Sequence, residues 1–234
     1  MEVQTRPGVD LSKVRFGGQG GEFLEIEELD LSPYAIVGVL GEASTGKSIL
    51  LGLVAGVFSP LEGHVRRVLG AGVLRPHWSV GYYPENFLAR SDSQVLEYLH
   101  FHAGSKGIPL RKSSRSIEDL LEKLNLRPKA QKRIGQLSFC ERTLVSIVQA
   151  FIGDPPIIVL DEPFRELNLV SRGLLRQVII EASARALVIF STRRTEDLGI
   201  ADGLVTLNDG KLDFSGSCSY FDKNLFQENS REIE

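Results

Sequence analysis

The sequence is poor in cysteine, contains no long apolar run and has no strong excess of charge of either sign. Only two cysteines, Cys140 and Cys218, occur among its 234 residues, and neither has a Cys or His partner at ligand spacing. A disulfide framework and a zinc site are therefore not indicated, and two reduced thiols in cytosol are the simpler interpretation. The formal net charge of −3 argues against a surface that neutralises phosphate backbones, so we expect no nucleic-acid partner.

The apolar runs are also too short for a membrane span. The longest, residues 49–58, has about half of the ~20 residues that cross a bilayer, and residues 1–7 lack the apolar core of a secretory signal. We therefore expect a soluble chain that reaches a membrane only through partner chains. With 42% apolar and 24% charged residues, it has enough apolar side chains for the full core of one globular domain.

Three short apolar segments are typical of strands buried on both faces of a parallel sheet. They cover residues 35–40, 157–160 and 186–190, and each ends at a polar cluster. Helical stretches separate them, and this order predicts an α/β fold. Because ligands gather at the carboxyl ends of such strands, the three polar clusters are expected to meet at one site.

A helical insertion is predicted from about residue 85 to 152, where apolar side chains recur at spacings of three and four. We expect residues of about 1–84 and 153–215 to form the α/β core, and 216–234 to form a C-terminal tail. The insertion carries several basic residues, which we interpret as a solvated face rather than a binding patch. They are Arg111, Lys112, Arg115, Lys129, Lys132 and Arg133.

The segment after the first apolar strand matches the phosphate-loop pattern G-x-x-x-x-G-K-[ST] letter for letter, between a predicted strand and a predicted helix. Its glycines let successive N–H groups face phosphate oxygens, and the helix adds its positive N-terminal end. Lys47 is expected to reach the β- and γ-phosphates and to serve catalysis, and the Ser48 hydroxyl to ligate Mg²⁺. The predicted nucleotide-binding loop consists of Gly41, Glu42, Ala43, Ser44, Thr45, Gly46, Lys47 and Ser48.

Two acids follow the second apolar strand. Asp161 stands where a carboxylate can hold Mg²⁺ against the phosphate loop, directly or through water. Glu162 points differently and is expected to orient or deprotonate the attacking water as a catalytic residue. The alternative, that both acids before Pro163 merely cap a helix, stays open but loses weight beside an intact phosphate loop.

The order of these motifs resembles the nucleotide-binding domain of ATP-binding-cassette (ABC) ATPases over nearly the whole chain. The resemblance implies a P-loop NTPase fold with a RecA-like parallel-sheet core, an antiparallel β subdomain and a helical subdomain that carries a signature region. It also implies ATP and Mg²⁺ as cofactors, a second nucleotide-binding subunit, transmembrane partner subunits, and a cytoplasmic position on the inner face of a membrane. The motifs are Gly41–Ser48, Leu137-Ser138, Ile157–Pro163 and Ser191-Thr192.

Further matches to the family are weaker. The resemblance makes Phe16, with Phe23 as the substitute, the candidate to stack on adenine, although either ring could be plain core. Glu85 occupies the position where the family has a glutamine that senses Mg²⁺ and the transmembrane partner, so it is a candidate metal ligand. Asn208–Lys211 resembles a late hairpin turn.

The sequence departs from the family at positions that matter for hydrolysis. Ser138 of the signature Leu-Ser-Gly-Gly-Gln is present as a nucleotide-binding candidate, but Phe139 and Cys140 replace both glycines and Glu141 replaces the glutamine. Arg193 replaces a histidine that contacts the γ-phosphate, and it is retained here as a phosphate-binding candidate.

Because each ABC site combines the phosphate loop of one subunit with the signature of the other, these losses fall on different sites. We therefore hypothesise an asymmetric pair, more readily a heterodimer than a homodimer, in which this chain binds ATP firmly and hydrolyses it slowly. The leading interpretation is a transport ATPase. The alternatives are a regulatory or structural subunit with little turnover and, less favoured, a soluble ABC protein that acts on ribosomes or DNA.

Overall fold

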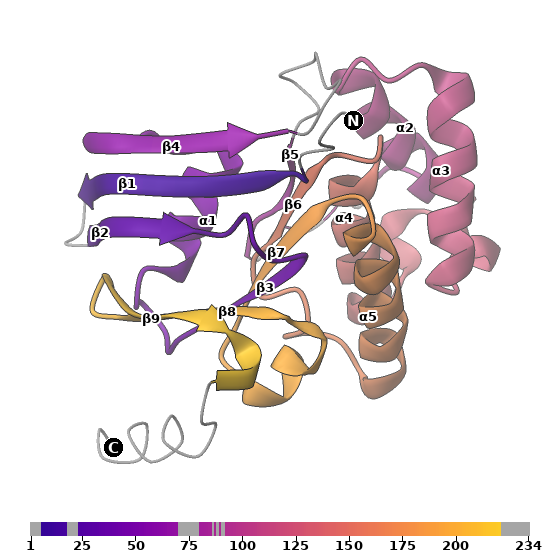
Figure 1. The fold of residues 1–234 in the computed structure, drawn as a ribbon. Coiled ribbons are helices and arrows are strands. Elements are labelled where there is room, and N and C mark those ends of the chain that lie inside the picture. Colours follow the sequence, from indigo (N-terminus) through magenta and orange to yellow (C-terminus); the bar gives the residue numbers. More distant parts are fainter. Residues whose placement is uncertain are drawn as a thin grey trace.

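The computed structural model describes residues 6–17, 23–69, 80–85, 87, 89 and 92–220. In this part of the chain the strands form one mixed sheet, in the order β4-β1-β2-β9-β8-β3-β7-β6-β5 (Figure 1). Helices cover the parallel half of this sheet, and a group of helices extends beyond its edge. None of the helices within the described ranges is long and apolar enough to cross a membrane.

The parallel half of the sheet confirms the predicted core. It contains β3 (Ile36–Leu40), β5 (Val80–Tyr83), β6 (Ile157–Leu160), β7 (Leu187–Thr192) and β8 (Gly203–Asn208), which all run in one direction. Strands β3, β6 and β7 are buried along their whole length. Alternate side chains face two different cores, as the period of two in a strand requires.

One core packs under α1 (Lys47–Ala55), and the other packs against α4 (Phe139–Phe151) and α5 (Leu169–Ser183). In β3, for example, Val37 and Val39 join the α1 side, whereas Ile36 and Leu40 join the α4 and α5 side. The apolar strands are therefore covered by helices on both faces, which is why they lack an alternating polar pattern.

The antiparallel part of the sheet consists of β1 (Gly8–Gly17), β2 (Phe23–Asp30) and β4 (Glu62–Val68), at the left of Figure 1. It meets the parallel part through β9 (Lys211–Ser217), where the pairing with β2 is limited to Glu25 and Lys211. The predicted turn at Asn208–Lys211 joins β8 to β9, with positive φ angles of 44° at Asp209 and 70° at Gly210. Such angles are those of a tight hairpin turn.

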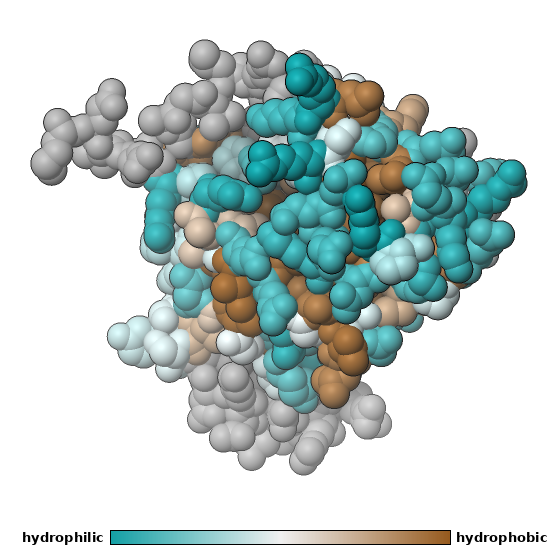
Figure 2. Space-filling view, turned by 90° about the vertical axis from the view of Figure 1, so that its right-hand side faces the viewer, coloured by the Kyte–Doolittle hydropathy of each residue, from teal (hydrophilic) through white to brown (hydrophobic). Residues whose placement is uncertain are grey.

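The predicted helical insertion is present as α2 (Val95–Ser105), α3 (Leu110–Lys123) and α4. Short 3₁₀ helices lie at η2 (Arg127–Lys129), η3 (Ile134–Gln136), η4 (Thr195–Ile200) and η5 (Cys218–Tyr220). Five of the six basic residues named above are exposed and Lys129 is half-buried. Figure 2 shows this side of the molecule, where hydrophilic side chains surround separate hydrophobic patches, in keeping with a solvated face.

The predicted C-terminal tail begins at residue 216, inside β9. The composition of β9, KLDFSGS, resembles a loop more than a strand, but its backbone pairs with β8 as far as the Gly203–Ser217 pair. Tertiary pairing therefore overrides local propensity here. The rest of the predicted tail, residues 221–234, lies outside the described residues.

A buried ion cluster ties α5 to the end of β7. Asp197 is 1% exposed, accepts a 2.9 Å hydrogen bond from Thr192 Oγ1, and pairs with Arg172 and Arg176 at 3.2 Å each. Replacing Asp197 with alanine leaves two guanidinium groups without this partner. We therefore expect the free energy of unfolding, measured in urea, to fall by about 3–5 kcal/mol. Glu196→Ala, which removes a surface pair, should change the free energy of unfolding by under about 1 kcal/mol. Equal losses in the two variants would contradict this account.

Candidate functional site

The loop between β3 and α1 folds back on itself as the phosphate-loop pattern predicts. Gly46 caps α1 with a φ of 97°, and a Cβ there would come within 3.1 Å of Leu24 Cδ1. Ser44 also has a positive φ, 62°, and Thr45 Oγ1 donates a 3.1 Å hydrogen bond to the carbonyl oxygen of Glu42. The left-handed angle at position 46 is open to glycine at little cost, which gives a physical reason for this residue in the loop.

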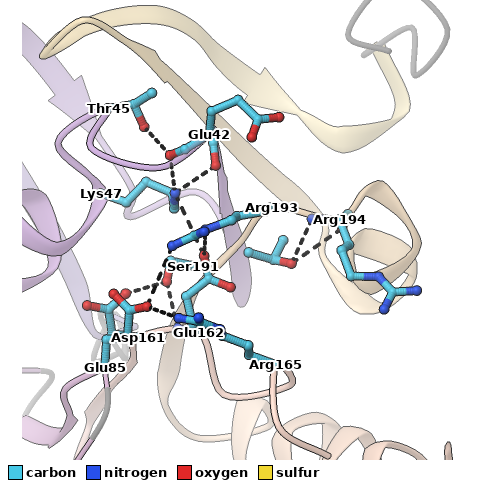
Figure 3. A network of polar contacts seen from close by, with 12 residues as sticks. Glu42, Thr45, Lys47, Glu85, Asp161, Glu162, Arg165, Ser191, Arg193 and Arg194 are labelled. Carbon is cyan, nitrogen blue, oxygen red and sulfur yellow. Dashed lines mark hydrogen bonds and ion pairs between the residues drawn. The ribbon is translucent and has the colours of Figure 1, made fainter. Parts of the chain in front are cut away.

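Lys47 lies inside this loop, with 6% of its surface exposed. Its Nζ donates 2.6 Å hydrogen bonds to the carbonyl oxygens of Gly41 and Glu42 (Figure 3). Burial lowers the pKa of the ammonium group, while the nearby Glu162 carboxylate opposes this shift. The loop therefore holds a partly desolvated cation whose present partners are mostly backbone oxygens.

The two acids lie at the end of β6, and Ser191 of β7 fixes both of them. Ser191 Oγ donates a 2.5 Å hydrogen bond to Asp161 Oδ1 and accepts a 2.7 Å bond from the backbone N–H of Glu162. Burial raises the pKa of Asp161, against the hydrogen bonds from Ser191 and Ser48. The effect of Ser48 on this carboxyl group indicates that the two oxygen ligands predicted for Mg²⁺ lie near each other.

Glu162 has a φ of 50°, an uncommon angle for a residue with a side chain. Burial raises the pKa of its carboxyl group, and the charges of Lys47 and Arg193 oppose that rise. Oε1 of Glu162 is buried and has no hydrogen-bond partner among the described residues, although two cations approach it. This side chain is therefore held by charge rather than by hydrogen bonds at that oxygen.

Arg193 and Glu85 complete the group of charges. Arg193 Nε lies 3.3 Å from Glu162 Oε1, and its terminal nitrogen lies 3.6 Å from Glu85 Oε1 (Figure 3). Glu85 also accepts a 2.5 Å hydrogen bond from Arg165. No sequence motif points to Arg165 as a site residue, because its contact with Glu85 joins residues 80 positions apart.

These side chains surround a cavity of about 190 Å³. Of the two aromatic candidates, Phe23 lines it and is 43% exposed, whereas Phe16 packs on Phe58 with ring centroids 5.4 Å apart. Gly41, Glu42 and Thr45 shape the loop without being among the lining residues. The described lining is Phe23, Ala43, Ser44, Gly46, Lys47, Ser48, Ile49, Glu85, Glu162 and Arg193.

The donor set fits a polyphosphate with a hard divalent cation. The cavity combines the N-terminus of a nine-residue helix with a buried ammonium group, and both favour phosphate. Among the described residues no group of three His, Cys, Asp or Glu side chains could hold a metal by itself. Mg²⁺ is compatible with this, because it is usually held by one or two protein oxygens together with phosphate oxygens and water.

Ser138 is not among the described residues that line this cavity. It caps α4: its Oγ accepts a 3.2 Å hydrogen bond from the Glu141 N–H, and Glu141 Oε2 accepts a 2.8 Å bond from the Ser138 N–H. Glu141 also pairs with Lys129 at 3.1 Å. The extra carboxylate of the altered signature is thus turned back and neutralised, and the pattern Ser-x-x-Glu is a sequence signal for such a capping box.

Comparisons with known proteins point to one family. The family model described as "ABC transporter" matches residues 24–165. The chain is 29% identical over 199 residues to ABC transporter A family member 8 of Dictyostelium discoideum, covering 83% of this chain and 24% of that protein. It is 28% identical over 195 residues to an uncharacterized ABC transporter ATP-binding protein of Methanocaldococcus jannaschii, covering 82% of this chain and 71% of that protein.

Solved structures of ABC cassettes share the fold. The dimeric structure of MJ0796, a bacterial ABC transporter cassette, superposes with a TM-score of 0.77 at 19% identity and covers 91% of this chain and 100% of that one. An ATP-binding subunit of an ABC transporter has a TM-score of 0.77 at 21% identity, with 95% and 93% coverage. The predicted P-loop NTPase architecture is thereby confirmed.

Proposed function

The chain belongs to the ABC transporter family as an ATP-binding domain, and from this premise we propose that it binds MgATP between residues 41 and 48 and hydrolyses it for membrane partner chains. The observation that carries the proposal is that Lys47, Ser48 and Glu162, which come from two separate motifs, line the same cavity. In the proposed assembly the chain lies in the cytoplasm, against transmembrane subunits and a second nucleotide-binding subunit.

The roles follow from position. Lys47 exchanges the carbonyl oxygens of the loop for β- and γ-phosphate oxygens, and the loop N–H groups bind the same phosphates. Ser48 and Asp161 would hold Mg²⁺, with Glu85 as a further candidate ligand; the ion, when bound, neutralises phosphate charge. Glu162 orients or deprotonates a water molecule for attack on the γ-phosphate. Phe23, at the rim of the cavity, is the better placed ring for adenine.

A second candidate function is a nucleotide-binding subunit with little hydrolysis. Two observations favour it: Arg193 pairs with Glu162, and Phe139 adds a ring, 44% exposed, beside Ser138. If this chain pairs with a regular cassette, the two defects fall on different composite sites. An asymmetric heterodimer with one slow site is the form of the proposal that accommodates both observations.

The Mg²⁺ dependence of binding tests the proposal on the isolated chain. Replacing Ser48 with alanine removes one oxygen ligand of the ion, so the affinity for MgATP should fall by about 10-fold, whereas the affinity for ATP in excess EDTA should stay within about 2-fold. Equilibrium titration with a fluorescent ATP analogue measures both constants. Ser44→Ala, at a neighbouring hydroxyl that the proposal does not assign to the ion, is the matched control.

Two results would contradict this function. The first is wild-type protein that binds ATP equally well with and without Mg²⁺ and is unaffected by Ser48→Ala. The second is an affinity-tagged chain that, purified from detergent-solubilised membranes of its own source, brings down no polytopic membrane protein.

A further inference from the structure

The charges around the cavity are balanced without a nucleotide. Among the described lining residues, two carboxylates, Glu85 and Glu162, face two cations, Lys47 and Arg193 (Figure 3). Outside the described lining, Arg165 pairs with Glu85 and with Glu166. A triphosphate with one Mg²⁺ brings a net charge of about −2, and a diphosphate with one Mg²⁺ about −1. A bound triphosphate therefore needs one more cation than a diphosphate, and this cation must leave a carboxylate.

Arg193 is the cation that can change partners most easily. Its contacts to Glu162 and Glu85 are 3.3 and 3.6 Å, and neither is a hydrogen bond in this structure, whereas Arg165 donates a 2.5 Å hydrogen bond to Glu85. Arg193 also lines the cavity, and its side chain is 37% exposed. Lys47, in contrast, is held by the carbonyl oxygens of the loop, and in the proposed function it binds a diphosphate as well as a triphosphate.

Phosphate is a strong competitor for such a guanidinium group. A planar guanidinium can bind two phosphate oxygens with parallel hydrogen bonds, which are shorter and stronger than the present contacts to carboxylates. When Arg193 leaves, Glu85 keeps Arg165 at 2.5 Å, whereas Glu162 keeps only the longer 3.7 Å contact with Lys47, a cation that the phosphates also attract. The exchange thereby frees the carboxylate that has no hydrogen bond at Oε1.

We propose that Arg193 is a latch on Glu162 that distinguishes a triphosphate from a diphosphate. Without nucleotide, Arg193 pairs with Glu162 and with Glu85, its second counter-ion. The terminal phosphate of a triphosphate attracts Arg193 and breaks both pairs. The inference rests on the proposed function, because it takes a nucleotide as ligand. In this arrangement a diphosphate leaves the latch closed, and only a triphosphate releases Glu162 toward water. Slow hydrolysis then reflects the cost of breaking the resting pair.

Equilibrium titrations of the isolated chain with Mg²⁺ test the latch, using ADP and a non-hydrolysable ATP analogue. Arg193→Ala should lower the affinity for the triphosphate by about 10-fold and change that for ADP by less than about 2-fold. Arg193→Lys keeps the charge but lacks the planar fork, and it should recover part of the difference. Arg194→Ala is the matched control, since it removes the neighbouring guanidinium group, which pairs with the exposed Glu196 and is not among the described lining residues; it should shift both affinities alike.

Glu85→Gln tests the resting counter-ion. Measured in EDTA, where Glu85 has no metal to bind, this variant should raise the triphosphate affinity by about 3-fold, and by clearly less when Arg193 is already alanine. The latch is wrong if Arg193→Ala weakens both nucleotides equally or weakens neither, or if the two substitutions act independently. Wild-type protein that binds neither nucleotide would instead remove the proposed function, and the latch with it.

Discussion

Glutamine in place of Glu162 is expected to reduce steady-state ATP hydrolysis of the assembled complex by at least about 100-fold, while ATP still binds. A positioned general base contributes about 10²–10⁴ to a rate, and glutamine keeps the size of the side chain but cannot accept the proton. The change also removes the charge that Lys47 and Arg193 face at 3.7 and 3.3 Å. Affinity for ATP should therefore stay equal or rise, since both cations become free for phosphate.

The matched control for hydrolysis is Glu181→Gln, which removes a carboxylate paired with Lys123 on the exposed side of α5. Its rate should equal that of the wild-type complex. If Glu162→Gln left the rate unchanged in a complex that hydrolyses ATP, the turnover would belong to the partner subunit. This chain would then be the nucleotide-binding regulatory subunit of the second interpretation.

Alanine in place of Gly81 is expected to destabilise the folded chain by about 3 kcal/mol or more. Gly81 lies in β5, under α4, and a Cβ at this position would collide with the backbone carbonyl of Ala150 and come within 3.0 Å of Pro155. Backbone atoms cannot rotate away as a side chain can, so α4 and its partner strand must separate. Urea unfolding followed by circular dichroism measures the loss.

Gly173→Ala provides the control for this prediction. A Cβ at Gly173 meets no atom within 4 Å, and the residue lies inside α5, where alanine is the better helix former. This variant should gain about 0.5–1 kcal/mol of stability. Were Gly81→Ala as stable as Gly173→Ala, the packing of α4 on β5 described above would be wrong.

The residues that could be predicted are those whose chemistry is local. The phosphate loop is one continuous segment with fixed glycine positions. The acidic residues Asp161 and Glu162 directly follow an apolar strand. Parallel strands then bring their carboxyl ends to one edge, so the two motifs meet without further information. The helical insertion also follows from its own periodicity, because α2 and α3 each bury one apolar side, although α4 is buried all round from Thr143 to Phe151.

The features that escaped prediction depend on contacts between distant segments. The resemblance to the family ranks Phe16 above Phe23 as the adenine candidate, but in the β1–β2 register Phe16 lies opposite Leu24 and Phe23 opposite Gly17. Neighbouring residues of a strand face opposite sides, so the two rings point to different faces of the sheet. Sequence alone does not fix that register, just as it does not bring Arg165 to Glu85.

The central claim is that backbone N–H groups and one lysine bind the phosphates of ATP. Equilibrium titration of the purified chain with ATP, compared between wild type and Lys47→Ala, tests it most directly, with the exposed Lys112→Ala as control. The account predicts at least about 10-fold weaker binding for Lys47→Ala alone, because hydrogen bonds to a charged group contribute about 1.5–3 kcal/mol each. Unchanged ATP affinity in a folded Lys47→Ala chain would contradict it.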